Sequence, residues 1–375
     1  MLSALAALVL FPSLVRSLRP RLYFLLLVAF FVFAGVSTLW SPQPHVFVAF
    51  DFGQMKFAVR SEIIRVGLLL LAQGVLIGAA LRADDRGRAR VQRVARIALF
   101  TQLAILILLA AFEQQLLDML RPIIPDTGEG VQNISRNSLI MSIAAPVLAL
   151  GVVQGAPSRW SLAIAGVVIV ATAAILAYRE VHTGLLAMAG AAVAIGLVHF
   201  LPRYAFRIMS SATAILILSA PLTFGHLTRG ADFATATDSA SYRAAIWERV
   251  IELINQHPIT GGGLGILRTV RDTIEAGVFA GELTVPNHAH NMLLQLWVET
   301  GAIGAALISA AILLLGWRLP ARDRLGPAEM KVAGIGAGML AVASVSFDLW
   351  NEWWWAVGGL LVVLACLTPR AVADR

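Results

Sequence analysis

The chain has 375 residues, of which 58% are hydrophobic and 14% charged, and its mean hydropathy is +0.79. An ordinary soluble domain carries about 25% charged residues, so this composition excludes a soluble globular enzyme and indicates an integral membrane protein. The net charge of +7 does not indicate nucleic-acid binding, because the arginines cluster in short loops beside apolar segments, where membrane topology explains them. The single cysteine, Cys366, excludes an intramolecular disulfide.

Apolar runs of membrane-spanning length recur along the whole chain. They predict an all-α fold, a polytopic membrane helical bundle of about eleven transmembrane helices. The expected spans are residues 1–15, 21–40, 61–81, 93–112, 137–154, 160–178, 182–200, 206–222, 291–317, 330–346 and 352–368. We interpret the first as a short helix and not as a signal peptide, because no positively charged region precedes it.

The arginine-rich segment 82–93 is the strongest indicator of orientation. The positive-inside rule places it in the cytoplasm, and alternation then places the other arginine-rich loops there as well. The long polar segment 223–290 faces outward. The predicted organisation is one integral membrane domain, with N-terminal membrane helices over 1–222, a large periplasmic loop over 223–290 and C-terminal membrane helices over 291–375.

The large loop contains a helix with apolar periodicity from Ser241 to Gln256, which His257-Pro258 and the glycines at 261–263 then end. Arg243 shares one face of this helix with Trp247, so its side chain is expected to point toward whatever the helix packs on. We interpret residues 261–265, Gly-Gly-Gly-Leu-Gly, as a turn, because a phosphate-binding loop would follow a strand and end in Lys-Ser or Lys-Thr.

Three polar side chains are expected to converge on the outward face: Arg179 at a helix end, Arg243 on the loop helix, and His290 where the loop re-enters the membrane. Two guanidiniums, which stay charged and bind phosphate oxygens in a fork, suit a pyrophosphate leaving group. A histidine titrates near neutrality and can take a proton from an acceptor hydroxyl.

Each of these residues also has a structural interpretation. Arg179 could pair with Glu180 or anchor a headgroup, Arg243 could pair with Asp238 or Glu248, and His290 could cap the following helix. His288 is the rival for the role of base. Asn291, Gln295 and Glu299 recur every four residues as a polar stripe on an apolar helix, and a buried Glu299 either bonds to its neighbours or serves the site. The sequence also predicts an interfacial aromatic belt, formed by Trp350, Trp353, Trp354 and Trp355.

The stretch from Pro286 to Gly304 holds His-Asn, then Leu-Gln, an acidic residue and two glycines three apart. This pattern resembles the signature of the O-antigen ligase and polymerase superfamily of bacterial membrane glycosyltransferases. Further elements resemble the same superfamily: residues 178–184 around Arg179, where Tyr178 departs from the usual serine or threonine; Arg243 ahead of Trp247, with His257-Pro258-Ile259-Thr260-Gly261-Gly262-Gly263; Asn137 at the entry to the bundle; and, more weakly, Leu39-Trp40-Ser41-Pro42. The resemblance covers roughly residues 130–305.

The resemblance implies an inverting, metal-independent glycosyltransferase without a cofactor, in the bacterial inner membrane with its site facing the periplasm. A glycan would move from a polyprenyl (undecaprenyl) pyrophosphate carrier to an acceptor hydroxyl. His290 would be catalytic, Arg179 and Arg243 would bind the pyrophosphate, and His288, Asn291, Glu299 and Asn137 could support them. The acceptor would be lipid A core in a ligase or a second lipid-linked glycan in a polymerase, and a protein acceptor is a third possibility. A transporter of lipid-linked glycans or small solutes is the alternative from another class.

Overall fold

The structure of the chain, a computed structural model, describes residues 21–45, 48–51, 56–120, 128–155, 157–319 and 322–369. Helices make up nearly all of the regular structure, and this confirms the predicted all-α membrane fold. One small element was not expected from the sequence. Strands β1 (Val48–Asp51) and β2 (Lys56–Val59) form an antiparallel hairpin in which Val48 lies opposite Val59.

Twelve α-helices lie within the described ranges. In chain order they are α2 (Leu22–Val36), α3 (Glu62–Arg82), α4 (Asp85–Leu120), α5 (Gly128–Gly155), α6 (Arg159–Tyr178), α7 (His182–Phe200), α8 (Ala205–Leu218), α9 (Ala220–Leu227), α10 (Ser239–Gln256), α11 (Met292–Arg318), α12 (Pro327–Ala343) and α13 (Glu352–Cys366). Two short 3-10 helices, η1 (Ser37–Leu39) and η2 (Ile266–Thr269), complete the set.

By length and composition, seven of these helices can cross a membrane, or eight if α8 and α9 count as one span. The expected number of eleven is therefore not established, and the expected span at residues 1–15 lies outside the described part of the chain. The expected single helix at 206–222 is broken in the structure. It is two helices, α8 and α9, bent by 71° at a break, because Pro221 occupies the first turn of α9 and cannot continue the preceding helix.

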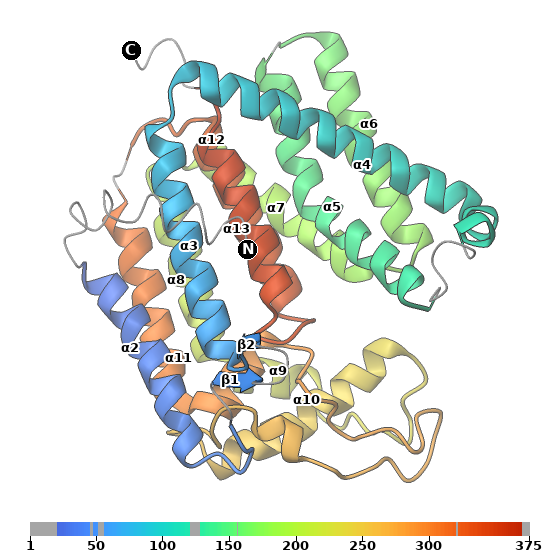
Figure 1. Cartoon of the computed structure of the whole chain (residues 1–375), viewed down its shortest axis with the longest axis vertical. Helices are drawn as coiled ribbons and strands as arrows, with labels where there is room; N and C mark the ends of the chain where they lie inside the picture. The colour runs from blue at the N-terminus through green and yellow to red at the C-terminus, as the bar shows by residue number, and fades with distance from the viewer. Residues whose placement is uncertain are drawn as a thin grey trace.

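The helices form two groups with α12 and α13 between them (Figure 1). Helices α2, α3, α8 and α11 lie on one side and α4 to α7 on the other. Helix α11 packs along α2 and α8, and α12 packs along α7. Across one end of the bundle lie α10, the long loops on either side of it and the β1–β2 hairpin, so the candidate residues of the large loop all gather at that end.

The arginine-rich segment has a structural role at the opposite end of α3. The guanidinium of Arg88 is buried and donates to the carbonyl oxygens of Ala80, Leu81, Cys366 and Thr368. The carbonyls of Ala80, Leu81 and Cys366 belong to the last turns of α3 and α13, and that of Thr368 follows α13, at helix ends where the regular helical hydrogen bonds stop. A cation at the C-terminal ends of two helices also complements their dipoles. Arg88 therefore fastens α3 to α13.

Helix α11 is interrupted at Gly301, where φ is 59° and ψ is −160°. Segment 258–263 inserts there and takes over the interrupted hydrogen bonds. The amides of Ala302 and Ile303 donate to the carbonyls of residues 258 and 259, and the carbonyls of Val298 and Glu299 accept from the amides of residues 262 and 263. The glycine-rich stretch is a turn, as expected, and its glycines let the backbone of the loop contact the backbone of α11.

The tryptophans near the start of α13 do not all form the expected aromatic belt. Trp350 and Trp354 are only 4% and 1% exposed. The indole of Trp350 donates to the carboxylate of Glu299, and Trp354 packs with Phe347 and Trp353. These two side chains are therefore part of the protein core at the site end of the bundle.

Candidate functional site

Helix α10 carries Arg243 toward the membrane helices. Asp238 caps the helix by accepting from the amides of Ala240 and Ser241, so α10 begins at Ser239, after the loop that follows α9. The guanidinium of Arg243 donates to the carbonyl oxygen of Val345, in the turn between α12 and α13, at 3.4 Å. The expectation that Arg243 points toward the surface on which α10 packs is thus confirmed.

Arg243 has no carboxylate partner among the residues that the structure describes. Of the two acids considered from the sequence, Asp238 caps α10 and Glu248 accepts from the hydroxyl of Thr228. Burial lowers the pKa of Arg243. A partly buried cation that is not neutralised by a carboxylate is costly unless an anion joins it.

The segment that holds both histidines is fixed to α10 by a hydrogen bond. The indole of Trp247 donates to the carbonyl of Ala289 at 3.0 Å, and Ala289 itself is fully buried. The rings of His288 and His290 consequently lie side by side, with their centroids 4.1 Å apart. Both histidines are within electrostatic reach of Arg243.

His290 has a backbone φ of 51°, in the left-handed region that non-glycine residues seldom adopt. Strained residues of this kind cluster at functional sites. Burial, the neighbouring His288 and Arg243 together lower the pKa of His290 to about 3. At neutral pH its imidazole is therefore uncharged and keeps one nitrogen that can accept a proton.

The cap of α11 is Asn291 and not His290. The side-chain oxygen of Asn291 accepts from the amides of Leu293 and Leu294 at 3.0 and 3.1 Å. The structural interpretation of His290 as the helix cap is therefore wrong. The side chain of Asn291 is completely buried at the point where the chain enters α11. Because His290 is the preceding residue, this anchor also fixes the backbone position of His290.

Glu299 belongs to a buried hydrogen-bond network. Its carboxylate accepts from the amide of Gly265, the side chain of Gln295 and the indole of Trp350 at 3.2, 3.1 and 2.7 Å. Gln295 also donates to Asp348 at 2.8 Å. The network joins α11, the glycine-rich loop and the turn before α13, so Glu299 stabilises the framework around the histidines.

A second charged group adjoins this network. Arg268 donates to both carboxylate oxygens of Glu62 at 2.6 and 2.7 Å and lies 3.8 Å from a carboxylate oxygen of Asp348. Burial lowers the pKa of His288, and the nearby carboxylate of Asp348 opposes this effect in part. The start of α3, the loop after α10 and the turn before α13 thus meet beside the histidines.

The sequence pattern that defines the O-antigen ligase family matches residues 131–309. Over these residues, just under half of the chain, the protein is therefore similar to the O-antigen ligase family. Similar curated proteins occur in Rickettsia typhi and Rickettsia prowazekii, each 24% identical over 194 residues, and in Rickettsia conorii, 25% identical over 194 residues. They carry the provisional name polysaccharide ligase. Each match covers 48% of this chain and 46–47% of the relative, so the chain spans about half the length of the curated relatives it matches.

The O-antigen ligase segment runs from α5 into the first two thirds of α11 and contains every residue proposed from the sequence for the site. Within it, the structure brings together Arg243, His288 and His290. Arg179 ends α6, and Val181 of the same turn belongs to a hydrophobic cluster with Met292, two residues after His290. Arg179 is not among the charged groups that shift the pKa of either histidine. Its role as a second pyrophosphate ligand stays a prediction.

Asn137 lies on α5. Its side chain is exposed, and its carbonyl oxygen accepts from Gln102 of α4. A supporting role for this residue stays a prediction.

Sequence reasoning did not identify Arg268, Glu62 or Asp348 as part of the site. Arg268 lies 206 residues from Glu62 along the chain, and no short motif links residues so far apart. Glu62 and Asp348 also lie outside the O-antigen ligase segment. The polar turn of Asp348 between apolar helices was the available signal.

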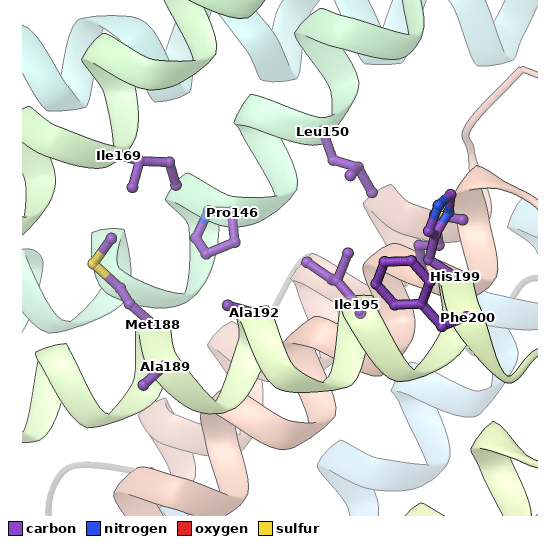
Figure 2. A pocket seen from close by; sticks show the side chains of 11 residues that line it. Pro146, Leu150, Ile169, Met188, Ala189, Ala192, Ile195, His199 and Phe200 are labelled. Atoms are coloured by element: carbon purple, nitrogen blue, oxygen red, sulfur yellow. The ribbon is translucent and has the colours of Figure 1, made fainter.

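An apolar cavity of about 670 Å³ opens between α5, α6, α7 and α12. Figure 2 shows Pro146, Ile169, Met188 and Ala192 around it, with His199 and Phe200 at one end. The cavity follows α7 from Met188 to Phe200, so its nearer end lies six residues after His182, the first residue of α7. Its lining suits a hydrocarbon chain.

Proposed function

We propose that the chain is a membrane glycosyltransferase of the O-antigen ligase type. It moves a glycan from a polyprenyl pyrophosphate carrier, undecaprenyl pyrophosphate in bacteria, to a hydroxyl of lipid A core. The observation that carries this proposal is the juxtaposition of Arg243, which has no carboxylate partner in the described structure, with the neutral His290. Such a pair offers one group for an anionic leaving group and one for a proton.

Arg243 binds the pyrophosphate of the donor. A phosphate oxygen accepts a charge-assisted hydrogen bond from a guanidinium, and this bond is strongest where little water competes. Arg179, at the turn between α6 and α7, contributes the second guanidinium. Both cations stabilise the charge that grows on the pyrophosphate as its bond to the sugar breaks.

His290 accepts the proton of the acceptor hydroxyl as the hydroxyl oxygen attacks the anomeric carbon. The bond between that carbon and the pyrophosphate oxygen breaks on the opposite side, and its electron pair leaves with the polyprenyl pyrophosphate. The product is therefore a glycoside of inverted configuration. The low pKa of His290 leaves the imidazole unprotonated at neutral pH, so that a ring nitrogen can accept the proton.

The proposed location is the bacterial inner membrane, with the site on the periplasmic side. Supporting this orientation, segment 82–93 and α10 lie at opposite ends of α3 (Figure 1), so a cytoplasmic arginine-rich segment leaves α10 outside. A transporter is less well supported, because the charged candidates gather at one end of the bundle, whereas transport sites usually lie near the membrane midplane.

A polymerase that uses a second lipid-linked glycan shares the same chemistry, so the acceptor decides between the two. The test is transfer by the purified protein from undecaprenyl-pyrophosphate oligosaccharide to lipid A core and, separately, to a second carrier-linked oligosaccharide. We expect product with lipid A core. Product with the carrier-linked glycan alone would establish a polymerase. Movement of the lipid-linked glycan across liposomes without any glycosidic product would refute the transferase proposal.

The apolar cavity is proposed to hold the polyprenyl chain of the donor. Ala192 lines it (Figure 2), so Ala192→Trp is expected to fill the space that the chain would occupy. The KM for a full-length polyprenyl donor should rise about tenfold, because part of the apolar burial of the chain is lost. The KM for a donor with a ten-carbon chain, too short to extend along the cavity, should stay within twofold of wild type.

The matched control is Val193→Trp. Val193 follows Ala192 on the same helix and is 72% exposed on the outer surface of the bundle, so the same added bulk points away from the cavity. Both variants should remain monodisperse in detergent. Equal KM changes for the long and short donors in Ala192→Trp would contradict this placement of the chain.

A further inference from the structure

A second cavity, of about 440 Å³, lies at the same end of the bundle and has a different character. It is formed where three stretches of the chain meet: the segment after η1, the start of α3 and the loop after the glycine-rich turn. Its polar lining residues are Gln43, His45, Arg60, Ser61, Glu62 and Arg268. We call it the polar cavity.

The walls of the polar cavity are fixed to each other. The hydroxyl of Ser41 donates to the carbonyl of Leu264 at 2.6 Å, and a ring nitrogen of His45 lies 2.9 Å from the same oxygen. Gly265, with a φ of 71°, forms the floor, where an added Cβ would lie 3.4 Å from Gln43 and 3.6 Å from His45. The cavity is therefore part of the folded framework.

Several polar groups of the cavity have no partner within the described part of the protein. The hydroxyl oxygen of Ser61 is buried without a hydrogen bond. Arg60 is exposed and takes part in no ion pair with the residues that the structure describes. Two guanidiniums face the cavity against the single carboxylate of Glu62, which already pairs with Arg268. The cavity thus offers hydrogen bonds and an excess of positive charge.

Arg268 connects the polar cavity to the histidines. It lines the cavity and also lies 3.8 Å from Asp348, which acts electrostatically on His288. Gly265, in the floor, donates its amide to Glu299 of the network beneath the histidines. A ligand in the cavity would therefore contact Arg268, whose ion pair with Asp348 leads to His288, the ring beside the proposed base.

The two halves of the cavity differ in origin. Leu264, Gly265 and Arg268 lie within the O-antigen ligase segment, whereas the remaining lining residues precede it by at least 69 positions, since Glu62 is the last of them and the segment begins at 131. The proposed catalytic residues all lie in the part of the chain that matches the family. Most residues that line the polar cavity lie outside that part.

We propose that the polar cavity binds an anionic sugar of the acceptor glycan, with Arg60 as the residue that recognises its phosphate or carboxylate. This inference rests on the proposed function, since it assigns the acceptor side of the same reaction. Gln43 and Ser61 contribute hydrogen bonds to sugar hydroxyls, and Arg268 positions the sugar next to Asp348. A donor glycan is the competing occupant, and the experiment separates the two.

The first test is equilibrium binding without the donor. Purified protein is titrated with deacylated, phosphorylated core oligosaccharide and with the same oligosaccharide after its phosphates have been removed. Arg60→Ala should weaken binding of the phosphorylated form about tenfold, because one hydrogen bond between charged groups is lost, and should leave binding of the dephosphorylated form unchanged. Arg229→Ala is the matched control, since Arg229 is exposed in the loop after α9 and does not line the cavity.

The second test is transfer from undecaprenyl-pyrophosphate oligosaccharide to phosphorylated lipid A core. Arg60→Ala should raise the KM for the acceptor about tenfold and leave kcat and the KM for the donor unchanged. Gln43→Trp, which fills the cavity, should raise the acceptor KM for both phosphorylated and dephosphorylated core. Binding that depends on Arg60 without any transfer by wild type would refute the proposed function and keep the binding site. Transfer in which neither variant changes the acceptor KM, or in which the donor KM changes instead, would overturn the inference.

Discussion

Replacing His290 with alanine is expected to lower the rate of glycan transfer by about 10²- to 10⁴-fold, the range typical of a lost general base. The neutral imidazole is the proposed proton acceptor, and the described residue best placed to substitute for it is His288, whose ring centroid lies 4.1 Å from that of His290. The measurement is the initial rate of product formation with saturating donor and acceptor. The KM for the donor should change little, because Arg243 and Arg179 remain.

The control for this experiment has to separate loss of the imidazole from strain in the backbone at residue 290. The φ of His290 is 51°, and an alanine at this position is strained, whereas asparagine tolerates the left-handed region. His290→Asn should therefore melt closer to wild type than His290→Ala and be equally inactive. An active asparagine variant would show that the imidazole is dispensable. Full activity in His290→Ala together with loss in His288→Ala would move the role of base to His288.

The low pKa of His290 also sets the expected pH profile of the wild type. A base with a pKa of about 3 stays unprotonated from pH 8 down to pH 5, so kcat/KM should show no fall around pH 6.5, the value for an unperturbed histidine. A fall centred near pH 6.5 that disappears in His288→Ala would indicate that His288 is the titrating group.

Replacing Gly301 with alanine is expected to destabilise the folded protein by about 3 to 5 kcal/mol, because two costs combine. The backbone at φ 59° and ψ −160° belongs to a region that is open essentially to glycine alone. An added Cβ would also lie 2.4 Å from the carbonyl oxygen of Ile259 and 2.5 Å from the amide nitrogen of Gly261. Both are backbone atoms and cannot turn away as a side chain could.

The measurement is the melting temperature of the purified protein, together with the monodisperse fraction after extraction in detergent. Gly336→Ala is the matched control, since Gly336 lies inside α12 with no atom within 4 Å of the added Cβ, and alanine there should be neutral or stabilising. A Gly301→Ala protein that melts within about two degrees of wild type would show that segment 258–263 is not held in this way.

The course of the membrane helices was predictable because the signal is local. A run of about 20 apolar residues determines a helix wherever it occurs, and α3, α6, α7 and α11 begin and end within two residues of their expected limits. The bend between α8 and α9 was missed although Pro221 marked it, since hydropathy alone does not distinguish a straight span from a broken one.

The candidate site could be predicted only in part, for a physical reason. Motifs at short spacing identified Arg243, His288 and His290, which α10 and the start of α11 bring together. The cap at Asn291 could not be separated from His290, because both are polar residues at the entrance of one helix. The pairing of Arg268 with Glu62 and the burial of Trp350 against Glu299 depend on tertiary packing of segments far apart in sequence, and no pattern in the chain encodes those neighbours.

The interruption of α11 bears on how the protein is made. If α11 entered the lipid before the loop had folded onto it, the carbonyls of Val298 and Glu299 and the amides of Ala302 and Ile303 would face hydrocarbon without partners, at a cost of several kcal/mol for each group. Segment 258–263 precedes α11 in the chain, so the ribosome delivers the partners first. Helix α11 then acquires its full set of hydrogen bonds only by assembling with a segment that has been synthesised before it.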